Sequence, residues 1–82
     1  MTEQAIQHLA AEQRFVLQVE NASAILEYRR NDSDIDFCHT FVPPEFRGKG
    51  LAEKLVRHGL AWAKAEQLNI HASCWYVQKF LK

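Results

Sequence analysis

Residues 42–52 read Val-Pro-Pro-Glu-Phe-Arg-Gly-Lys-Gly-Leu-Ala, and the periodicity of the sequence changes across this stretch. A strand-like alternation precedes it. The two prolines cannot donate hydrogen bonds to a sheet ladder, so they end that strand. Beyond the second glycine, apolar residues recur with helical spacing as far as Gln67. We therefore predict a loop that leads from a strand into a long helix over residues 48–67.

Upstream of this loop, three short segments alternate apolar and polar residues: 14–20, 24–29 and 35–41. This period of two is typical of half-buried strands. Their short, turn-like connections at 21–23 and 31–34 predict an antiparallel meander. In the third strand, the alternation is expected to place four side chains on one face: Ile35, Phe37, His39 and Phe41.

Downstream of the long helix, residues 69–74 are too few for a second helix and are predicted to form a buried strand parallel to the strand before the loop. Residues 75–82 favour a short closing helix, with Val77, Phe80 and Leu81 packing inward. Residues 2–13 indicate a frayed terminus or a lead-in to a strand. The expected fold is α+β, in the order β-β-β-α-β-α, with an antiparallel meander, a β-α-β crossover and a mixed sheet.

The composition predicts one small domain spanning residues 1–82, because 9.5 kDa suffices for one hydrophobic core. No apolar run is long enough to cross a membrane and the N-terminal flank is acidic, so we expect a cytoplasmic protein that does not bind membranes. Cys38 and Cys74 are then expected to be free thiols. No Cys/His spacing is typical of a zinc site, so no metal is expected.

Ten basic and ten acidic residues give a formal net charge of zero, which argues against a nucleic-acid-binding surface. The two halves of the chain differ, however. Residues 1–41 hold three basic and seven acidic side chains, whereas residues 42–82 hold seven basic and three acidic ones. Such asymmetry arises by chance in small chains, but it also suits an anion site in the second half.

The glycine-containing loop has the properties of a phosphate site. A helix N-terminus presents unpaired N–H groups and the positive end of the helix dipole. Gly48 and Gly50 allow a phosphate to approach the backbone, and Arg47 and Lys49 add positive charge. The plain alternative is a glycine-rich turn into a helix. The spacing fits neither a P-loop nor the three-glycine Rossmann fingerprint.

The segment Arg47-Gly48-Lys49-Gly50-Leu51-Ala52 resembles the R/Q-x-x-G-x-G/A signature of the GNAT superfamily of N-acetyltransferases. The resemblance implies that residues 47–52 bind the pyrophosphate of acetyl-CoA. It also implies that the strand before the loop splays from its neighbour, so that the main chain of Phe41 and Val42 pairs with the pantetheine arm and the thioester carbonyl. More narrowly, the chain is similar to short, stand-alone GNAT-like proteins, which share a His-Thr pair before Val-Pro-Pro and a cysteine after the last strand.

In this sequence those features correspond to His39-Thr40 and Cys74, and the resemblance makes His39 and Cys74 the catalytic candidates. An imidazole suits a general base near neutral pH, although a buried, hydrogen-bonded histidine is an equally ordinary outcome. A cysteine at a helix start has a lowered pKa and could protonate the CoA thiolate or accept the acetyl group, although free cysteines are often apolar filler. Tyr76 is a weaker candidate acid.

Two functions from different classes follow from the resemblance. The first is an acyltransferase that moves an acetyl group from acetyl-CoA to an unidentified amine. The second is a CoA- or acyl-CoA-binding module without transfer activity, because the sequence lacks the helices and strands with which full-size relatives build the acceptor pocket. Either could act as a monomer or a homodimer. Cys38 is expected to be a core residue, and the two tryptophans, Trp62 and Trp75, are expected to serve core or rim packing.

Overall fold

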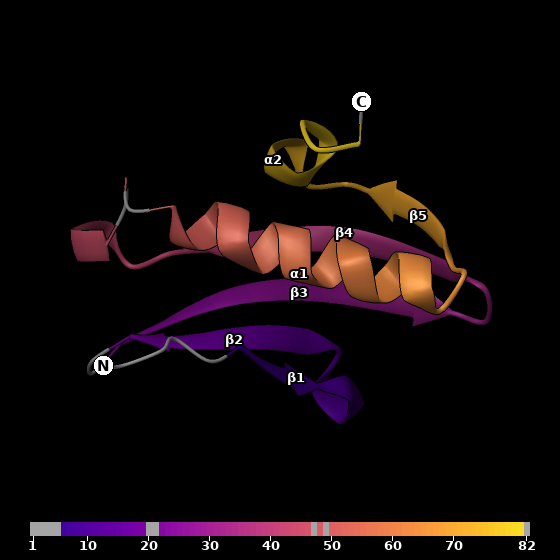
Figure 1. The fold of residues 1–82 in the computed structure, drawn as a ribbon, viewed down its shortest axis with the longest axis horizontal. Helices are drawn as coiled ribbons and strands as arrows, with labels where there is room; N and C mark the ends of the chain where they lie inside the picture. The colour runs from indigo at the N-terminus through magenta and orange to yellow at the C-terminus, as the bar shows by residue number, and fades with distance from the viewer. Residues whose placement is uncertain (1–5, 20–21, 47, 49, 82) are drawn as a thin grey trace.

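The computed structural model describes residues 6–19, 22–46, 48 and 50–81 of the 82-residue chain. It contains one five-stranded sheet and two helices (Figure 1). The strands are β1 (Ile6–Leu9), β2 (Arg14–Val19), β3 (Ala22–Asn31), β4 (Asp34–Phe41) and β5 (Asn69–Ala72). The helices are α1 (Leu51–Ala65) and α2 (Trp75–Gln78), with short 3-10 turns at Ala10–Glu12 and Pro44–Phe46.

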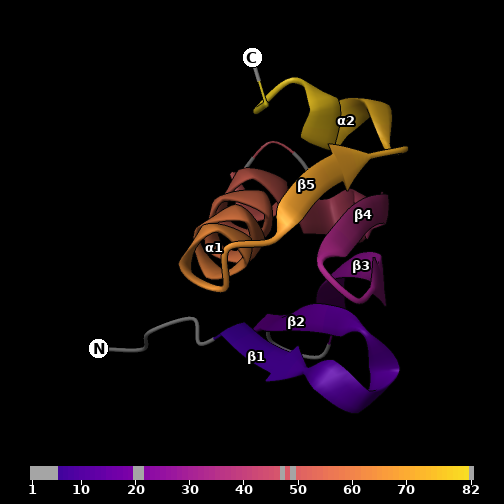
Figure 2. The same ribbon diagram turned by 90° about the vertical axis from the view of Figure 1, so that its right-hand side faces the viewer.

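The sheet order is β1-β2-β3-β4-β5, in which the first four strands are antiparallel and β5 runs parallel to β4. Helix α1 makes the crossover between β4 and β5 and covers one face of the sheet (Figure 2). These features confirm the predicted α+β class, meander and β-α-β crossover. Strand β1 lies within residues 2–13, for which the sequence indicated a frayed terminus or a lead-in to a strand.

Several predicted boundaries were wrong by a few residues. Ala22 and Ser23 belong to β3 rather than to a turn, because they pair with the end of β2. Helix α1 begins at Leu51 because Gly50 has a left-handed backbone, with φ of +77°. In the closing segment Val77 is fully buried as expected, but Leu81 is 40% exposed and does not pack inward.

The hydrophobic core lies between α1 and the sheet. Its largest fully buried side chains come from both layers: Phe15, Leu17, Leu26, Ile35, Phe37, Leu55, Val56 and Val77. Gly59 brings the backbone of α1 close to the strands, since a Cβ there would lie 2.8 Å from Leu26 Cδ2 and 3.1 Å from Phe37 Cε1. The packing therefore fixes the position of α1 over β3 and β4.

An aromatic cluster attaches the edge strand β1 to the rest of the sheet. The imidazole of His8 stacks on Phe15, with ring centroids 4.2 Å apart, and its Nε2 shares a 2.6 Å hydrogen bond with the hydroxyl of Tyr28. Trp62 of α1 approaches the same imidazole edge-on at 4.5 Å. Burial, and secondarily the nearby His58, lower the pKa of His8, which favours the neutral ring in this position.

A β-bulge interrupts the pairing of β3 with β4. Tyr28 pairs with Phe37, but the preceding residue, Glu27, pairs with His39, so Cys38 is the extra residue on β4. The Cys38 Sγ lies 3.7 Å from the Glu27 carbonyl oxygen, and the side chain is half-buried, less deeply than a core residue.

This bulge reverses which side chains of β4 face α1. Before it, Ile35 and Phe37 are fully buried against the helix. Beyond it, Thr40 pairs with the core residue Leu26 and faces the helix side, whereas His39 and Phe41 turn to the opposite face and are exposed. The prediction that His39 and Phe41 share a face with Ile35 and Phe37 was therefore wrong, because the extra residue shifts the alternation by one.

Candidate functional site

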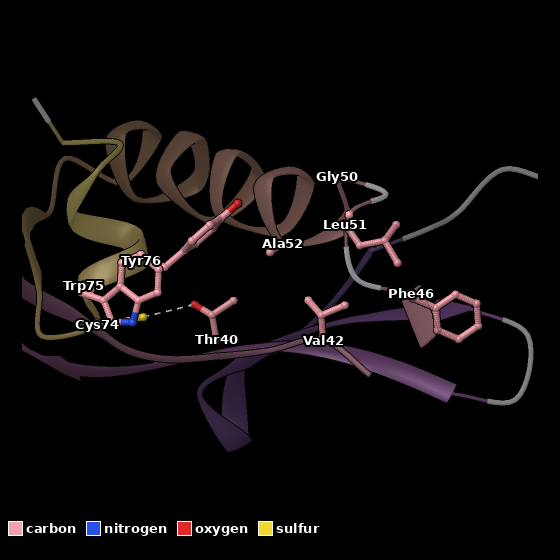
Figure 3. A pocket seen from close by; sticks show the side chains of 10 residues that line it. Thr40, Val42, Phe46, Gly50, Leu51, Ala52, Cys74, Trp75 and Tyr76 are labelled. Carbon is pink, nitrogen blue, oxygen red and sulfur yellow. Dashed lines mark hydrogen bonds between the residues drawn. The ribbon is translucent and has the colours of Figure 1, made fainter. Parts of the chain in front are cut away.

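A cleft opens between the end of β4, the start of α1 and the start of α2 (Figure 3). Its volume is about 570 Å³. Ten described residues line it: Thr40, Val42, Phe46, Gly48, Gly50, Leu51, Ala52, Cys74, Trp75 and Tyr76. The cleft therefore joins the glycine-containing loop to the segment around Cys74, the two parts of the sequence that the motif analysis singled out.

The cleft exists because β4 and β5 separate. Their parallel pairing ends at Phe37 and Ala72, whereas β4 continues to Phe41. The N–H groups of Ser73 and Cys74 both donate to the Phe37 carbonyl oxygen at 3.1 Å, and the chain then turns into α2. On the side away from β3, the second half of β4 consequently borders the cleft instead of β5.

Asp36 and Ser73 hold this separation point in place. The Asp36 carboxylate accepts two hydrogen bonds from Ser73: one from the backbone N–H at 2.7 Å and one from the hydroxyl at 2.6 Å. Both oxygens are engaged, so the peptide between Ala72 and Ser73 and the Ser73 side chain are fixed against β4. We refer to this pair as the Asp36–Ser73 clamp.

Cys74 faces Thr40 across the cleft, with 3.6 Å between Sγ and the hydroxyl oxygen (Figure 3). Burial by itself raises the pKa of the Cys74 thiol. Hydrogen bonds outweigh burial and lower that pKa: they come from the side chain and backbone of Thr40 and from the backbone N–H groups of Val77 and Tyr76. The thiol is therefore more acidic than an ordinary cysteine, which suits nucleophilic attack.

Substituting Asp36→Asn is expected to slow alkylation of Cys74 by iodoacetamide about threefold or more at neutral pH, in a Cys38→Ser background. The amide cannot accept both Ser73 donors, so Cys74 shifts away from the groups that stabilise its thiolate. A lowered pKa gives more thiolate at a given pH. The midpoint pH, at which the alkylation rate of Cys74 is half its maximum, should therefore be lower in the folded Cys38→Ser parent than in the unfolded chain. The Asp36→Asn variant should move that midpoint upward.

Asp34→Asn provides the matched control, because Asp34 lies two residues away on the same strand and contacts His71 at 3.5 Å. That variant should leave the alkylation profile of Cys74 unchanged. Equal profiles for the two variants would contradict the role of the clamp.

At the other end of the cleft, the loop presents open backbone. Gly48 and Gly50 have φ of +85° and +77°, and no atom lies within 4 Å of a Cβ built on either residue. Gly50 caps α1 without a side-chain hydrogen bond, so the first N–H groups of the helix face this end of the cleft. Leu51 is buried and Ala52 half-buried where they line it. Arg47 and Lys49 lie outside the described residues.

The two catalytic candidates are not brought together. Cys74 lines the cleft, whereas His39 is exposed on the opposite face of the sheet, and the general-base role predicted for it stays a prediction. Val42 lines the cleft, whereas the Phe41 side chain is 41% exposed and is not among the described lining residues. A contribution of Phe41 would therefore come from its main chain.

Two aromatic residues form the wall beside Cys74. Burial, with a smaller effect of the Glu53 carboxylate, raises the pKa of Tyr76, so its hydroxyl stays protonated and suits proton donation. Trp75 is 71% exposed, and the expectation that it serves packing holds only in that it contacts Tyr76 edge-on at the rim of the cleft. The contacts of Thr40 and of the Asp36–Ser73 clamp were not predicted from the sequence. The sequence did contain a signal for Thr40, because Thr40 belongs to the His39-Thr40 pair.

Two properties of the described residues bear on other classes of function. In the part of the chain that the structure describes, no group of three or more His, Cys, Asp or Glu side chains is arranged to hold a metal ion. Neither described helix is long and apolar enough to span a bilayer.

Comparison with protein families gives a match over most of the chain. A sequence model described as "GCN5-related N-acetyl-transferase" matches residues 14–82. The family is thus matched over every element from β2 onward, including the loop, the cleft and α2.

Individual relatives agree with this match. Protein NATD1 from Bos taurus is 44% identical over 48 residues, which cover 58% of this chain and 42% of NATD1. The Homo sapiens NATD1 is 42% identical with the same coverage. This chain thus matches less than half the length of these curated relatives. A Staphylococcus aureus protein whose solution structure is described as GCN5-like superposes with a TM-score of 0.75 at 30% identity, covering 99% of this chain and 80% of that one.

Proposed function

Because this chain belongs to the GCN5-related N-acetyltransferase family, we propose that it binds acetyl-CoA in the cleft between β4 and α1 and transfers the acetyl group to an amine. The observation that carries the proposal is the continuity of the cleft. A single cavity runs from the open backbone of Gly48 and Gly50 to the acidified thiol of Cys74. In this proposal, the loop end of the cavity binds the anionic part of the ligand and the Cys74 end faces its thioester.

The lining of the cleft fits the chemistry of CoA. At the loop end, the positive φ angles and empty Cβ positions of Gly48 and Gly50 leave room for phosphate against the helix N-terminus. Val42, Phe46 and Leu51 give the cleft an apolar surface suited to the methylene groups of pantetheine. We propose that residues 47–52 hold the pyrophosphate, with Arg47 and Lys49 adding charge.

We propose that the main chain of Phe41 and Val42 supports the pantetheine arm as an added strand would. This role suits the second half of β4, because its pairing with β5 has already ended at Phe37. When bound, acetyl-CoA would supply an activated acyl thioester. The residues of the chain would orient that ligand along β4 and exclude water on the side covered by α1.

Cys74 is proposed as the reactive side chain, either as the proton donor to the departing thiolate or as a transient acetyl acceptor. Thr40 stabilises the thiolate of Cys74 by hydrogen bonding. Tyr76, kept protonated by its raised pKa, is the second proton donor at this end. His39 remains the predicted general base from the sequence, to be tested by substitution.

We expect Cys74→Ala to lower turnover about 100-fold, the size typical of losing a positioned acid or nucleophile. Free CoA thiol would be followed with acetyl-CoA and a panel of small amines. Cys74→Ser is the matched variant, because it replaces the thiol with a hydroxyl group of similar size that lacks the acidity of the thiol. An equal loss in His39→Ala would support the general-base role of His39 despite its position. Turnover unaffected by both Cys74→Ala and His39→Ala would overturn both catalytic roles.

A CoA- or acyl-CoA-binding module without transfer is the second candidate function. It is favoured by the lining of the cleft, where the described residues include no His, Asp or Glu that could act as a general base. Calorimetry with CoA, acetyl-CoA and longer acyl-CoAs separates the two functions. Tight binding without turnover on any amine would favour the module, and no binding to CoA would overturn both.

A further inference from the structure

Lys79 places its ammonium group on the aromatic wall of the cleft. Its Nζ lies 4.9 Å from the ring centroid of Tyr76 and 5.3 Å from that of Trp75. These rings meet edge-to-face, with centroids 5.8 Å apart, and both line the cleft directly after Cys74. An amine of the chain itself therefore lies against two residues that line the reactive end of the proposed acetyl-CoA site, although Lys79 is not among the described lining residues.

The backbone of α2 explains this position. Lys79 follows Trp75 by four residues and Tyr76 by three, so the three side chains share one face of the short helix. The Lys79 N–H donates to the Tyr76 carbonyl oxygen at 3.3 Å, and the side-chain amide of Gln78 anchors the turn by donating to the Ala72 carbonyl oxygen at 2.8 Å.

The contacts of Lys79 leave its amine accessible. Lys79 is exposed, and none of the ion pairs among the described residues includes it. Cation–π contacts at an exposed site are weak, so they do not hold the side chain on the rings and leave its amine free to move. Lys64 is also exposed, but it lies in the last turn of α1, at the end of the helix away from the cleft-lining residues.

We propose that Lys79 is an acetyl acceptor in cis, so that the protein acetylates its own Lys79 Nζ; this inference rests on the proposed function. In the transfer, the free-base amine attacks the carbonyl carbon of the acetyl thioester and a C–N bond forms. The C–S bond breaks, and the sulfur leaves as a thiolate. The nitrogen loses one proton to give the amide, and the thiolate takes up one proton.

Acetylation would change the mouth of the cleft. An acetylated lysine carries no charge, so the attraction of Nζ to the faces of Trp75 and Tyr76 is lost. The intrinsic fluorescence of the exposed Trp75 is then expected to change with the modification, which gives a readout independent of turnover on added amines.

The test incubates the full chain with isotope-labelled acetyl-CoA and maps acetylated lysines by peptide mass spectrometry. We expect Lys79 to be modified about tenfold faster than Lys64, because a positioned amine reacts at high effective concentration. The rate should be first order in the protein, so that the fraction of Lys79 modified per unit time does not depend on the protein concentration, as a reaction in cis requires. Lys79→Arg should remove this fast modification and the fluorescence change, while Lys64→Arg should remove neither.

The outcomes separate this inference from the proposed function. Turnover on added amines without acetylation of Lys79 would overturn the inference and leave the proposed function standing. Equal modification of Lys79 and Lys64, or equal rates in urea-unfolded protein, would show only chemical acetylation and would also overturn it. Absence of CoA binding by calorimetry would overturn both.

Discussion

Replacing Gly50 with glutamate is expected to weaken CoA binding by about 100-fold, or about 2.7 kcal/mol. The added Cβ meets no atom within 4 Å, so the side chain would extend into the open space proposed for the phosphates. Its carboxylate would repel the pyrophosphate at the helix N-terminus, where the unpaired N–H groups attract anions. The measurement is calorimetric titration with CoA at physiological ionic strength.

The folded structure should persist in this variant. The positive φ of Gly50 disfavours any other residue by about 1–2 kcal/mol. A carboxylate at a helix N-terminus offsets part of that loss, by about 0.3–1 kcal/mol. Gly50→Gln is the matched control, because it has the same length and the same backbone strain without the charge. We expect the glutamine variant to lose about tenfold in affinity.

The difference in CoA affinity between the two variants measures the electrostatic contribution of the added carboxylate. Raising the salt concentration should reduce the difference in CoA affinity between Gly50→Glu and Gly50→Gln, because exposed charges are screened. Unchanged CoA affinity in Gly50→Glu would refute the assignment of the loop as a phosphate site.

The parts of the site that the sequence predicted are those set by neighbouring residues. The loop, the helix that follows it and the order of elements from β2 onward depend on proline, glycine and periodicity within short windows, and the structure confirms them. Cys74 was predicted to precede a helix, and it does so within the cleft. Arg47 and Lys49, on which the charge argument depends, lie outside the described residues.

The parts that were missed depend on pairing between distant strands. The alternation from Ile35 to Phe41 is unbroken in the sequence, and only the register against β3 shows that Cys38 is an extra residue. Because of this extra residue, Thr40 rather than His39 lines the cleft. The Asp36–Ser73 clamp likewise joins residues 37 positions apart, and nothing in either local sequence indicates the contact.

The largest effect on stability is expected for Gly59→Val, which should lower the free energy of unfolding by about 3 kcal/mol. The first added carbon would lie 2.8 Å from Leu26 Cδ2 and 3.1 Å from Phe37 Cε1. Leu26 is only 1% exposed and Phe37 fully buried, so neither can move aside without displacing other core residues. The branched side chain would therefore push α1 away from β3 and β4.

Urea denaturation would measure this loss, and Ala61→Val gives the control. Ala61 lies two residues further along α1 on its exposed side, so it reports the helix propensity of valine, about 0.5 kcal/mol, without core contact. Equal losses in the two variants would show that close packing at Gly59 does not limit stability. Because a domain of this size has a stability of about 4–12 kcal/mol, a loss of 3 kcal/mol removes a large share of it.

The Gly59→Val substitution in the core is also expected to affect the cleft. Gly50 and Leu51 lie at the N-terminus of the helix that Gly59 seats against the sheet, so a displaced α1 would change the distance from the loop to β4. Ligand that binds only the folded state raises the apparent stability by mass action. Saturating CoA should therefore stabilise Gly59→Val less than Ala61→Val, because the first variant alters the cleft and the second leaves it intact.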